Sequence, residues 1–148
     1  MKLVSPPLPL DQKGMSLVEI LVAIVILSVG LLGLAGLQAN SLRASQGSLY
    51  RAQAAALAGD LAERMRTNLG DARNYSHALG DTPPAGSSVR AADIADWLAR
   101  VQSLPGGQGA VAVDAATSRV TITVQWDDTR AGGPADASHI TETRLWNQ

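Results

Sequence analysis

The feature that most constrains the fold of this chain is an uninterrupted apolar segment near its N-terminus. Residues 20–37 form a stretch of 18 residues without a charged side chain, and with residues 15–19 they make a helix candidate of 23 residues. At about 1.5 Å per residue such a helix is about 35 Å long, which is enough to cross a bilayer. The sequence therefore predicts a membrane-spanning helix over residues 15–37. Three glycines inside it, Gly30, Gly33 and Gly36, fit either local flexibility or the close approach of another helix.

The residues before this segment form a separate part of the chain. Residues 1–14 contain three prolines and no helical or strand period, which predicts an unstructured leader. Both lysines of the protein, Lys2 and Lys13, lie in this leader. The positive-inside rule then predicts a cytoplasmic leader and a periplasmic domain made of residues 38–148.

The composition excludes several functions. Twelve Lys and Arg against thirteen Asp and Glu give a net charge of −1, so long-range attraction to nucleic acid is not expected. The chain has no cysteine, which excludes disulfides, zinc–thiolate sites and thiol nucleophiles.

The helical pattern continues beyond the apolar segment but becomes amphipathic. Residues 38–68 carry apolar side chains at helical spacing with charged residues between them, and no proline occurs between Pro9 and Pro83. We therefore expect one continuous helix of roughly fifty residues, ending near Gly70. Its apolar face, which we expect to pack on a sheet, consists of Leu42, Leu49, Leu57, Leu61 and Met65.

The remaining residues predict a short helix and three strands. Residues 70–90 are rich in Gly, Asp, Pro and Ser and indicate a loop, followed by a one-faced helix over 93–104. Alternating patterns predict strands at 109–114, 119–126 and 140–146, with a polar loop at 127–138. The fold class is therefore α+β, a long N-terminal helix packed on a small antiparallel sheet. Trp97 and Trp126 are expected in its core.

The sequence offers little that points to catalysis. His77 and His139 are isolated and have no carboxylate or second histidine at metal-ligand spacing. Asp127, Asp128 and Asp136 flank a glycine-containing loop but lack the ordered spacing of a calcium loop. We predict no catalytic residue, no metal site and no cofactor, and hence no enzyme.

One charged residue stands out at the start of the apolar segment. A carboxylate such as Glu19 costs about 2.5–3.5 kcal/mol at the centre of a bilayer and less near its edge. Glu19 either marks the edge of the membrane segment or has a partner. The residues upstream, Lys13-Gly14-Met15-Ser16-Leu17-Val18-Glu19, favour a partner because they resemble the N-terminus of type IV prepilins.

This resemblance assigns a role to each residue of the motif. In that family a basic leader ends in Gly, and a prepilin peptidase cuts after it on the cytoplasmic face. Gly14 is then the last leader residue, Met15 the new and N-methylated N-terminus, and Glu19 the fifth residue of the mature chain. The family usually has Phe where this chain has Met15. The resemblance implies an ion pair between the new ammonium group and Glu19 of the adjoining subunit, which sets axial register.

The resemblance extends along the chain and is strongest over residues 13–66. It is closest to the minor pilin subgroup PilV, the type IV pilus modification protein, on residues 27–38 and 58–66 and on Trp126-Asp127-Asp128. It implies a lollipop-shaped subunit of the inner membrane and then of the pilus, where we expect it at the tip. Its implied partners are other minor pilins, the major pilin, the prepilin peptidase and the inner-membrane assembly platform. The implied function is priming of pilus assembly, with adhesin presentation and twitching motility.

Two other functions fit part of the same evidence. A pseudopilin of a type II secretion system would share the leader and the helix. A signal-anchored periplasmic binding module, or a secreted protein, would not polymerise. An ordinary signal peptide has an apolar core of about 7–15 residues with the cleavage site after it. Here the apolar segment is longer and the cleavage motif precedes it.

Overall fold

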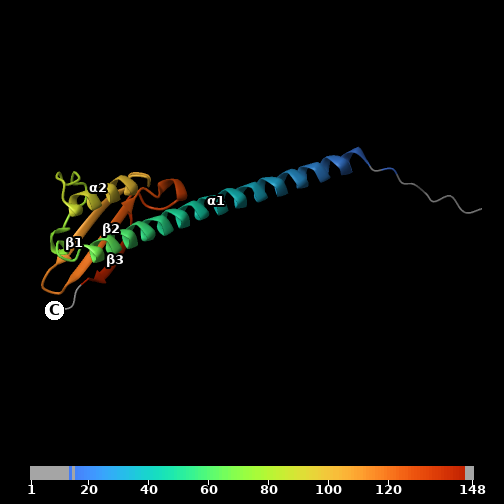
Figure 1. Ribbon diagram of the computed structural model, residues 1–148. Helices are drawn as coiled ribbons and strands as arrows, with labels where there is room; N and C mark the ends of the chain where they lie inside the picture. The colour runs from blue at the N-terminus through green and yellow to red at the C-terminus, as the bar shows by residue number, and fades with distance from the viewer. Residues whose placement is uncertain (1–13, 15, 146–148) are drawn as a thin grey trace, which may run out of the picture. The chain divides into compact units, whose positions relative to one another are not determined.

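The structure, a computed structural model, describes residue 14 and residues 16–145 and is dominated by one long helix (Figure 1). Helix α1 runs from Leu17 to Thr67 over 51 residues. It begins where the carbonyl oxygen of Ser16 accepts hydrogen bonds from the backbone N–H groups of Glu19 and Ile20, at 3.0 and 3.2 Å. The predicted continuous helix is confirmed. The chain divides into two compact units, with the boundary between Ala39 and Asn40.

The second unit combines the C-terminal part of α1 with a second helix and a sheet (Figure 1). Its further elements are η1 (Ala72–Asn74), α2 (Val89–Val101), β1 (Gln108–Asp114), β2 (Arg119–Trp126), η2 (Thr129–Ala131) and β3 (Ala137–Arg144). The three strands are antiparallel and lie in the order β1-β2-β3. The α+β fold with a long helix on a small antiparallel sheet is therefore confirmed.

A tight turn sets the register of the first two strands. Asp114 pairs with Arg119 across the end of the hairpin. The Asp114 carboxylate accepts hydrogen bonds from the backbone N–H groups of Ala116 and Thr117 and from the Thr117 hydroxyl, at 2.9, 3.3 and 2.6 Å. These bonds explain why a polar pentapeptide forms a turn here. They also hold the pKa of Asp114 below its usual value, first through the Thr117 hydroxyl.

The core lies between the inner face of the sheet and the two helices. Alternate residues of β2, namely Val120, Ile122, Val124 and Trp126, are buried, as the alternating pattern predicted. Trp97 of α2 is fully buried, and its indole N–H donates to the carbonyl oxygen of Leu57 on α1 at 3.0 Å. The core placement of Leu57, Leu61, Met65, Trp97 and Trp126 is confirmed.

The buried face of α1 differs from the predicted one. Leu42 and Leu49 are 67% and 63% exposed and do not pack on the sheet. Small residues are buried in their place, because Gly and Ala let the helix backbone approach the rest of the domain closely. The buried residues of α1 are Gly47, Ala54, Leu57, Ala58, Leu61, Ala62 and Met65. The expectation that all five large apolar residues share one packed face was therefore wrong for two of them.

Several boundaries also shift. Helix α2 begins four residues before the predicted Asp93, because the side chain of Ser88 caps it by accepting from the N–H of Ala91 at 3.1 Å. Strand β3 covers Ala137–Arg144 and not 140–146, and Trp146 lies outside the described residues. The stretch 70–90 is partly ordered into η1 and contains the buried Tyr75.

Two glycines provide a test of this packing. A Cβ atom at Gly109 would lie 2.4 Å from a ring carbon of the buried Trp97, whereas one at Gly59 on α1 would meet nothing within 4 Å. We expect Gly109→Ala to lower the free energy of unfolding by about 1–3 kcal/mol. Gly59→Ala should raise it by up to about 1 kcal/mol, because alanine favours the helix. Urea unfolding of the detergent-solubilised protein, followed by tryptophan fluorescence, measures both, and equal effects would contradict the packing.

Candidate functional site

The N-terminal motif lies at the beginning of α1. Gly14 is exposed and a side chain there would meet nothing within 4 Å. Glu19 is exposed in the first turn of the helix, where a negative charge interacts favourably with the helix dipole. The other predicted site residues, Met15, Lys2 and Lys13, lie outside the described residues. The structure thus places one carboxylate on an open helix surface, within reach of another molecule.

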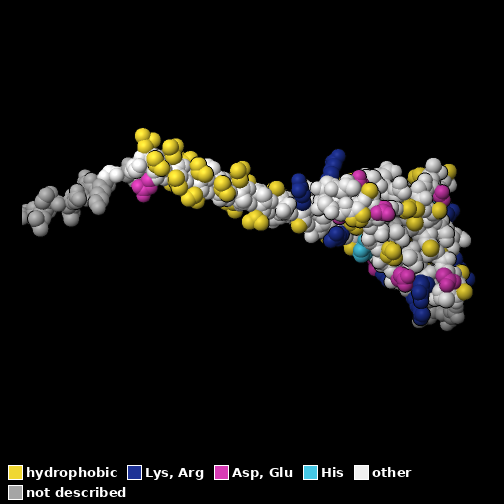
Figure 2. Space-filling view, turned by 180° about the vertical axis from the view of Figure 1, so that it is seen from behind, with side chains coloured by type: hydrophobic (Ala, Val, Ile, Leu, Met, Phe, Trp, Pro, Cys, Tyr) yellow, Lys and Arg dark blue, Asp and Glu magenta, His cyan; other side chains and the backbone are white. Residues whose placement is uncertain are grey.

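An extended apolar surface follows Glu19. Every large hydrophobic side chain of residues 17–37 is exposed, and Figure 2 shows these side chains along the first part of the helix. By its length and composition, α1 is able to cross a membrane. An apolar surface of this extent is not stable in water. It requires lipid or other protein around it.

The second unit also has exposed apolar side chains on α1. Leu42 and Leu49 lie seven residues apart and therefore on the same side of α1. Gly47, which packs on the domain, is five residues from Leu42 and so lies about 140° around the helix. One side of α1 is thus committed to the domain, while another side presents leucines outward. The sequence did not predict this second side, because both leucines were expected on the helix face that packs on the sheet.

A charged cluster joins α1 to α2. Arg64 of α1 contacts Asp60, Asp93 and Asp96 at 2.9, 3.3 and 2.7 Å, and Arg100 of α2 contacts Asp60 at 2.5 Å. The hydrogen bond from Arg100, followed by the charges of Arg64 and Arg100, holds the pKa of Asp60 below its usual value against the opposing effect of burial. The cluster fixes the position of α2 along α1. Its charges were visible in the sequence, but their pairing across 40 residues was not.

A buried tyrosine extends the cluster. The Tyr75 hydroxyl donates to Asp93 at 2.6 Å and accepts from the side-chain amide of Asn68 at 3.0 Å. Burial, followed by the hydrogen bond to Asp93, raises the pKa of Tyr75 to about 12. The hydroxyl therefore stays protonated at neutral pH and links the end of η1 to α2 and to Asn68, the residue after α1.

Two of the carboxylates in the acidic loop after β2 have partners within the molecule. Asp127 accepts from the N–H of Thr129 at 2.9 Å. Asp128 is 1% exposed and lies 3.6 Å from the guanidinium of Arg51 on α1. Asp136 is exposed. Within the described residues, no three or more His, Cys, Asp or Glu side chains gather to hold a metal ion.

The two histidines lie apart from each other. The backbone of His77 forms an isolated bridge with Val111 of β1, through hydrogen bonds of 2.9 and 2.8 Å. His139 is half-buried on β3, with its Nε2 atom 3.1 Å from the Thr141 hydroxyl. His77 thus extends the edge of the sheet at β1. The sequence predicted a loop over residues 70–90 and did not predict this bridge.

Two protein-family models match the chain. One, described as the prokaryotic N-terminal methylation motif, matches residues 10–35. The other, described as type IV pilin Tt1218, matches residues 36–94. The two matches are adjacent and together cover more than half of the chain. No curated protein and no solved structure matches it.

The charged cluster makes a pH-dependent contribution to stability. Because the pKa of Asp60 is depressed in the folded state, its contribution is present at neutral pH and is lost as the pH falls below 3.8 and through the folded-state value. We expect Asp60→Asn to lower the free energy of unfolding by about 1 kcal/mol at pH 7. The difference from wild type should shrink in strong acid.

Denaturant unfolding at a series of pH values measures this difference. Asp136→Asn is the matched control, since Asp136 is exposed on the loop before β3 and has no ion pair in the described part of the chain. A difference for Asp60→Asn that does not change with pH would contradict the role of the ionised carboxylate.

Proposed function

The chain belongs to the type IV pilin family, and from this premise we propose that it is a minor pilin, PilV-like, that primes pilus assembly. Pilins are structural proteins that assemble with other pilins after processing by a prepilin peptidase. The proposal adds a place in a tip complex with other minor pilins, contacts with the major pilin and the inner-membrane assembly platform, and roles in adhesin presentation and twitching motility.

The observation that carries the proposal is the exposed Glu19 carboxylate in the first turn of α1, directly before the apolar residues 20–37. Cleavage after Gly14 would create an ammonium group at Met15, and N-methylation keeps its positive charge. When helices from neighbouring subunits pack together, this ammonium would meet Glu19 of the adjoining subunit. Opposite charges attract more strongly in a low-dielectric bundle than in water, and an unpaired carboxylate there is costly. The pair would therefore fix the axial register of one subunit on the next.

The exposed side of α1 supports the same proposal. The apolar side chains of residues 17–37 suit lipid before assembly and other helices after it, since both surroundings are apolar. Leu42 and Leu49 extend this surface beyond the membrane segment. Buried in contacts between subunits, they would add hydrophobic stabilisation of about 1.5–3 kcal/mol each.

We propose a cellular location for each part of the chain. Residues 1–14 would be the cytoplasmic leader, residues 15–37 the membrane and filament-core helix, and residues 38–148 the periplasmic domain. Lys2 and Lys13 would hold the leader on the cytoplasmic side. After processing, the subunit would leave the inner membrane for the pilus.

The Glu19 pair is tested by assembly. In a strain that lacks the chromosomal copy, we expect Glu19→Gln to reach the membrane and to fold but to enter pili poorly. A charged hydrogen-bonded pair contributes about 1.5–3 kcal/mol, so incorporation should fall by about tenfold or more. Immunoblots of sheared filaments against the membrane fraction measure it.

Glu63→Gln is the matched control, because it makes the same change on an exposed part of the same helix. Incorporation of Glu19→Gln at the level of this control would argue against the ion pair. The deletion strain itself separates the two assemblies: it should lose surface pili if the protein is a pilus subunit, whereas loss of protein export would identify a pseudopilin.

The processing site is tested by the mass of the mature N-terminus. We expect the wild-type chain to begin with methylated Met15, and Gly14→Ala to retain residues 1–14 because the peptidase requires glycine before the cut. Gly36→Ala, the same substitution downstream of the cut in an equally open position, should be processed normally. Normal processing of Gly14→Ala, or cleavage after the apolar segment, would show that the site is misassigned.

A further inference from the structure

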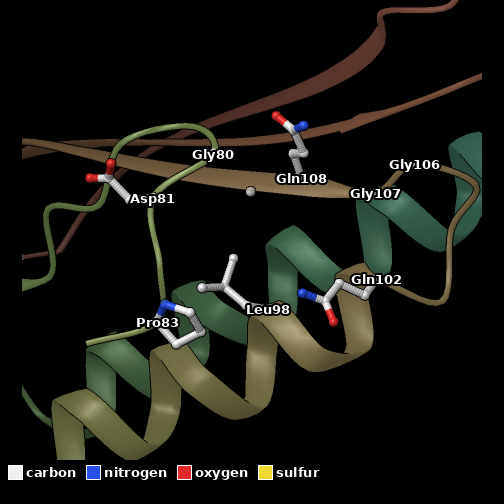
Figure 3. Close-up of a pocket in the computed structure, with 9 residues that line it drawn as sticks. Gly80, Asp81, Pro83, Leu98, Gln102, Gly106, Gly107 and Gln108 are labelled. Atoms are coloured by element: carbon white, nitrogen blue, oxygen red, sulfur yellow. The ribbon is translucent and has the colours of Figure 1, made fainter. Parts of the chain in front are cut away.

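The two edges of the sheet in the second unit differ in what covers them. The strand order β1-β2-β3 makes β1 and β3 the edge strands (Figure 1). The β1 edge is covered by the loop before α2, because His77 bridges to Val111 and a Cβ atom at Gly80 would lie 3.8 Å from the Gln108 side-chain oxygen (Figure 3). Within the described residues, no segment pairs with the outer side of β3. The β3 edge is therefore open.

The pairing with β2 shows which backbone groups face this open edge. Along an antiparallel strand, successive residues direct their N–H and C=O groups alternately to one side and the other. The N–H of Leu145, directly after β3, donates to the carbonyl oxygen of Ser118, directly before β2, at 3.3 Å. Every second residue back along β3 therefore also bonds toward β2. The residues between them direct their backbone groups to the open edge, and these are Ser138, Ile140, Glu142 and Arg144.

Strand β3 lacks the features that normally protect an edge. Natural edge strands are usually short, or are blocked by proline, lysine or a β-bulge. The eight residues of β3 contain no proline and no lysine and pair with β2 in one continuous register. The four residues whose backbone faces the edge also have exposed side chains, and Ile140 is 57% exposed. The edge is thus free to pair with another strand.

The charges on β3 indicate the chemistry of such a strand. Arg144 lies directly opposite Arg119 of β2, and like charges in this arrangement are unfavourable. Arg119 contacts Glu142 at 3.4 Å, whereas Arg144 has no ion pair in the part of the chain that the structure describes. An acidic residue on an added strand would neutralise Arg144, and a β-branched apolar residue on the same face would cover Ile140.

A second copy of this chain fits the edge poorly. Strand β3 runs in the same direction as α1. A Cβ atom at Gly47 would lie 3.3 Å from Ala131, in the loop before β3, and Arg66, near the end of α1, donates to the Thr143 hydroxyl at 2.8 Å. Antiparallel pairing of two β3 edges would therefore direct the two α1 helices oppositely. Two chains anchored through α1 in one membrane with the same orientation would not pair in this way.

We propose that the open edge of β3 binds an extended segment of a partner protein, which adds a fourth strand to the sheet. Backbone hydrogen bonds hold the segment, and its side chains give specificity, with an acidic residue beside Arg144 and an apolar residue beside Ile140. This inference rests on the second unit alone. It applies whether the chain assembles into a pilus or into a pseudopilus.

Synthetic strand peptides and the detergent-solubilised full-length protein test the proposal. The first probe is a fluorescent peptide of alternating valine and threonine, with one glutamate on its valine face. The second probe has lysine in place of the glutamate, and the third is the first with N-methyl groups on its backbone amides, which then cannot donate. Fluorescence anisotropy should show binding of the first probe, about tenfold weaker binding of the second and no binding of the third.

Matched variants identify the edge and its charge. Arg144→Glu should reverse the preference, so that the lysine peptide binds about tenfold more tightly than the glutamate peptide. Arg43→Glu, the same change at an exposed residue of α1, should keep the wild-type preference. Ile140→Pro removes an N–H group from the open edge without breaking a bond to β2, and it should abolish binding. Ile140→Val keeps this N–H group and should bind like wild type.

Unfolding midpoints establish which variants fold, and the charge reversal decides the question even if Ile140→Pro does not fold. The proposal is overturned if the first probe does not bind, if the N-methylated probe binds equally well, or if Arg144→Glu keeps the wild-type preference. A peptide-free protein that is dimeric by light scattering and becomes monomeric as folded Ile140→Pro would also overturn it, because the occupant would then be a second copy.

Discussion

Helix α1 has one part that is apolar and exposed and another part that packs on the domain. The rest of the structure depends on which of its side chains are exposed and which are buried. Along residues 20–37 every large side chain is apolar and exposed, so this part requires lipid or protein around it. From Gly47 onward, one side of α1 is buried against the domain, and several of the buried residues are small. The domain needs only a modest sheet, because the helix supplies much of its core.

The small residues also determine what remains outside. Because Gly47, Ala54 and Ala58 allow the helix backbone to approach closely, the domain is packed without the larger Leu42 and Leu49. Those leucines stay on the surface, where they continue the apolar character of the membrane segment. The charged cluster around Arg64 holds α2 in place on another side of the helix. One side of α1 therefore packs on the domain, and another side is exposed and able to contact other molecules.

Local sequence patterns predicted the helices and strands well. The features that they did not predict depend on contacts between residues far apart in the sequence. Strand β2 and the long helix follow from alternation and from the absence of proline, which are properties of neighbouring residues. Helical spacing placed Leu42 and Leu49 on the face expected to pack on the sheet, because a sequence pattern does not show where a domain ends along a helix. The pairing of Arg100 with Asp60 and the cap at Ser88 depend on tertiary contact or on a side-chain rotamer.

The N-terminal site differs from these long-range contacts. Its residues are adjacent in the sequence, and its proposed role lies in contacts between molecules. Glu19 has no role in the packing of the domain, yet an exposed carboxylate at the edge of an apolar surface needs a cationic partner once that surface is covered. In the proposed function, the new N-terminus of the chain itself, four residues away in sequence, would be one such partner. A second copy or a related subunit would offer the same group at a position that helix packing sets. In the proposed function, the Glu19 charge would thus set the register between subunits, and its energy would be realised when chains assemble.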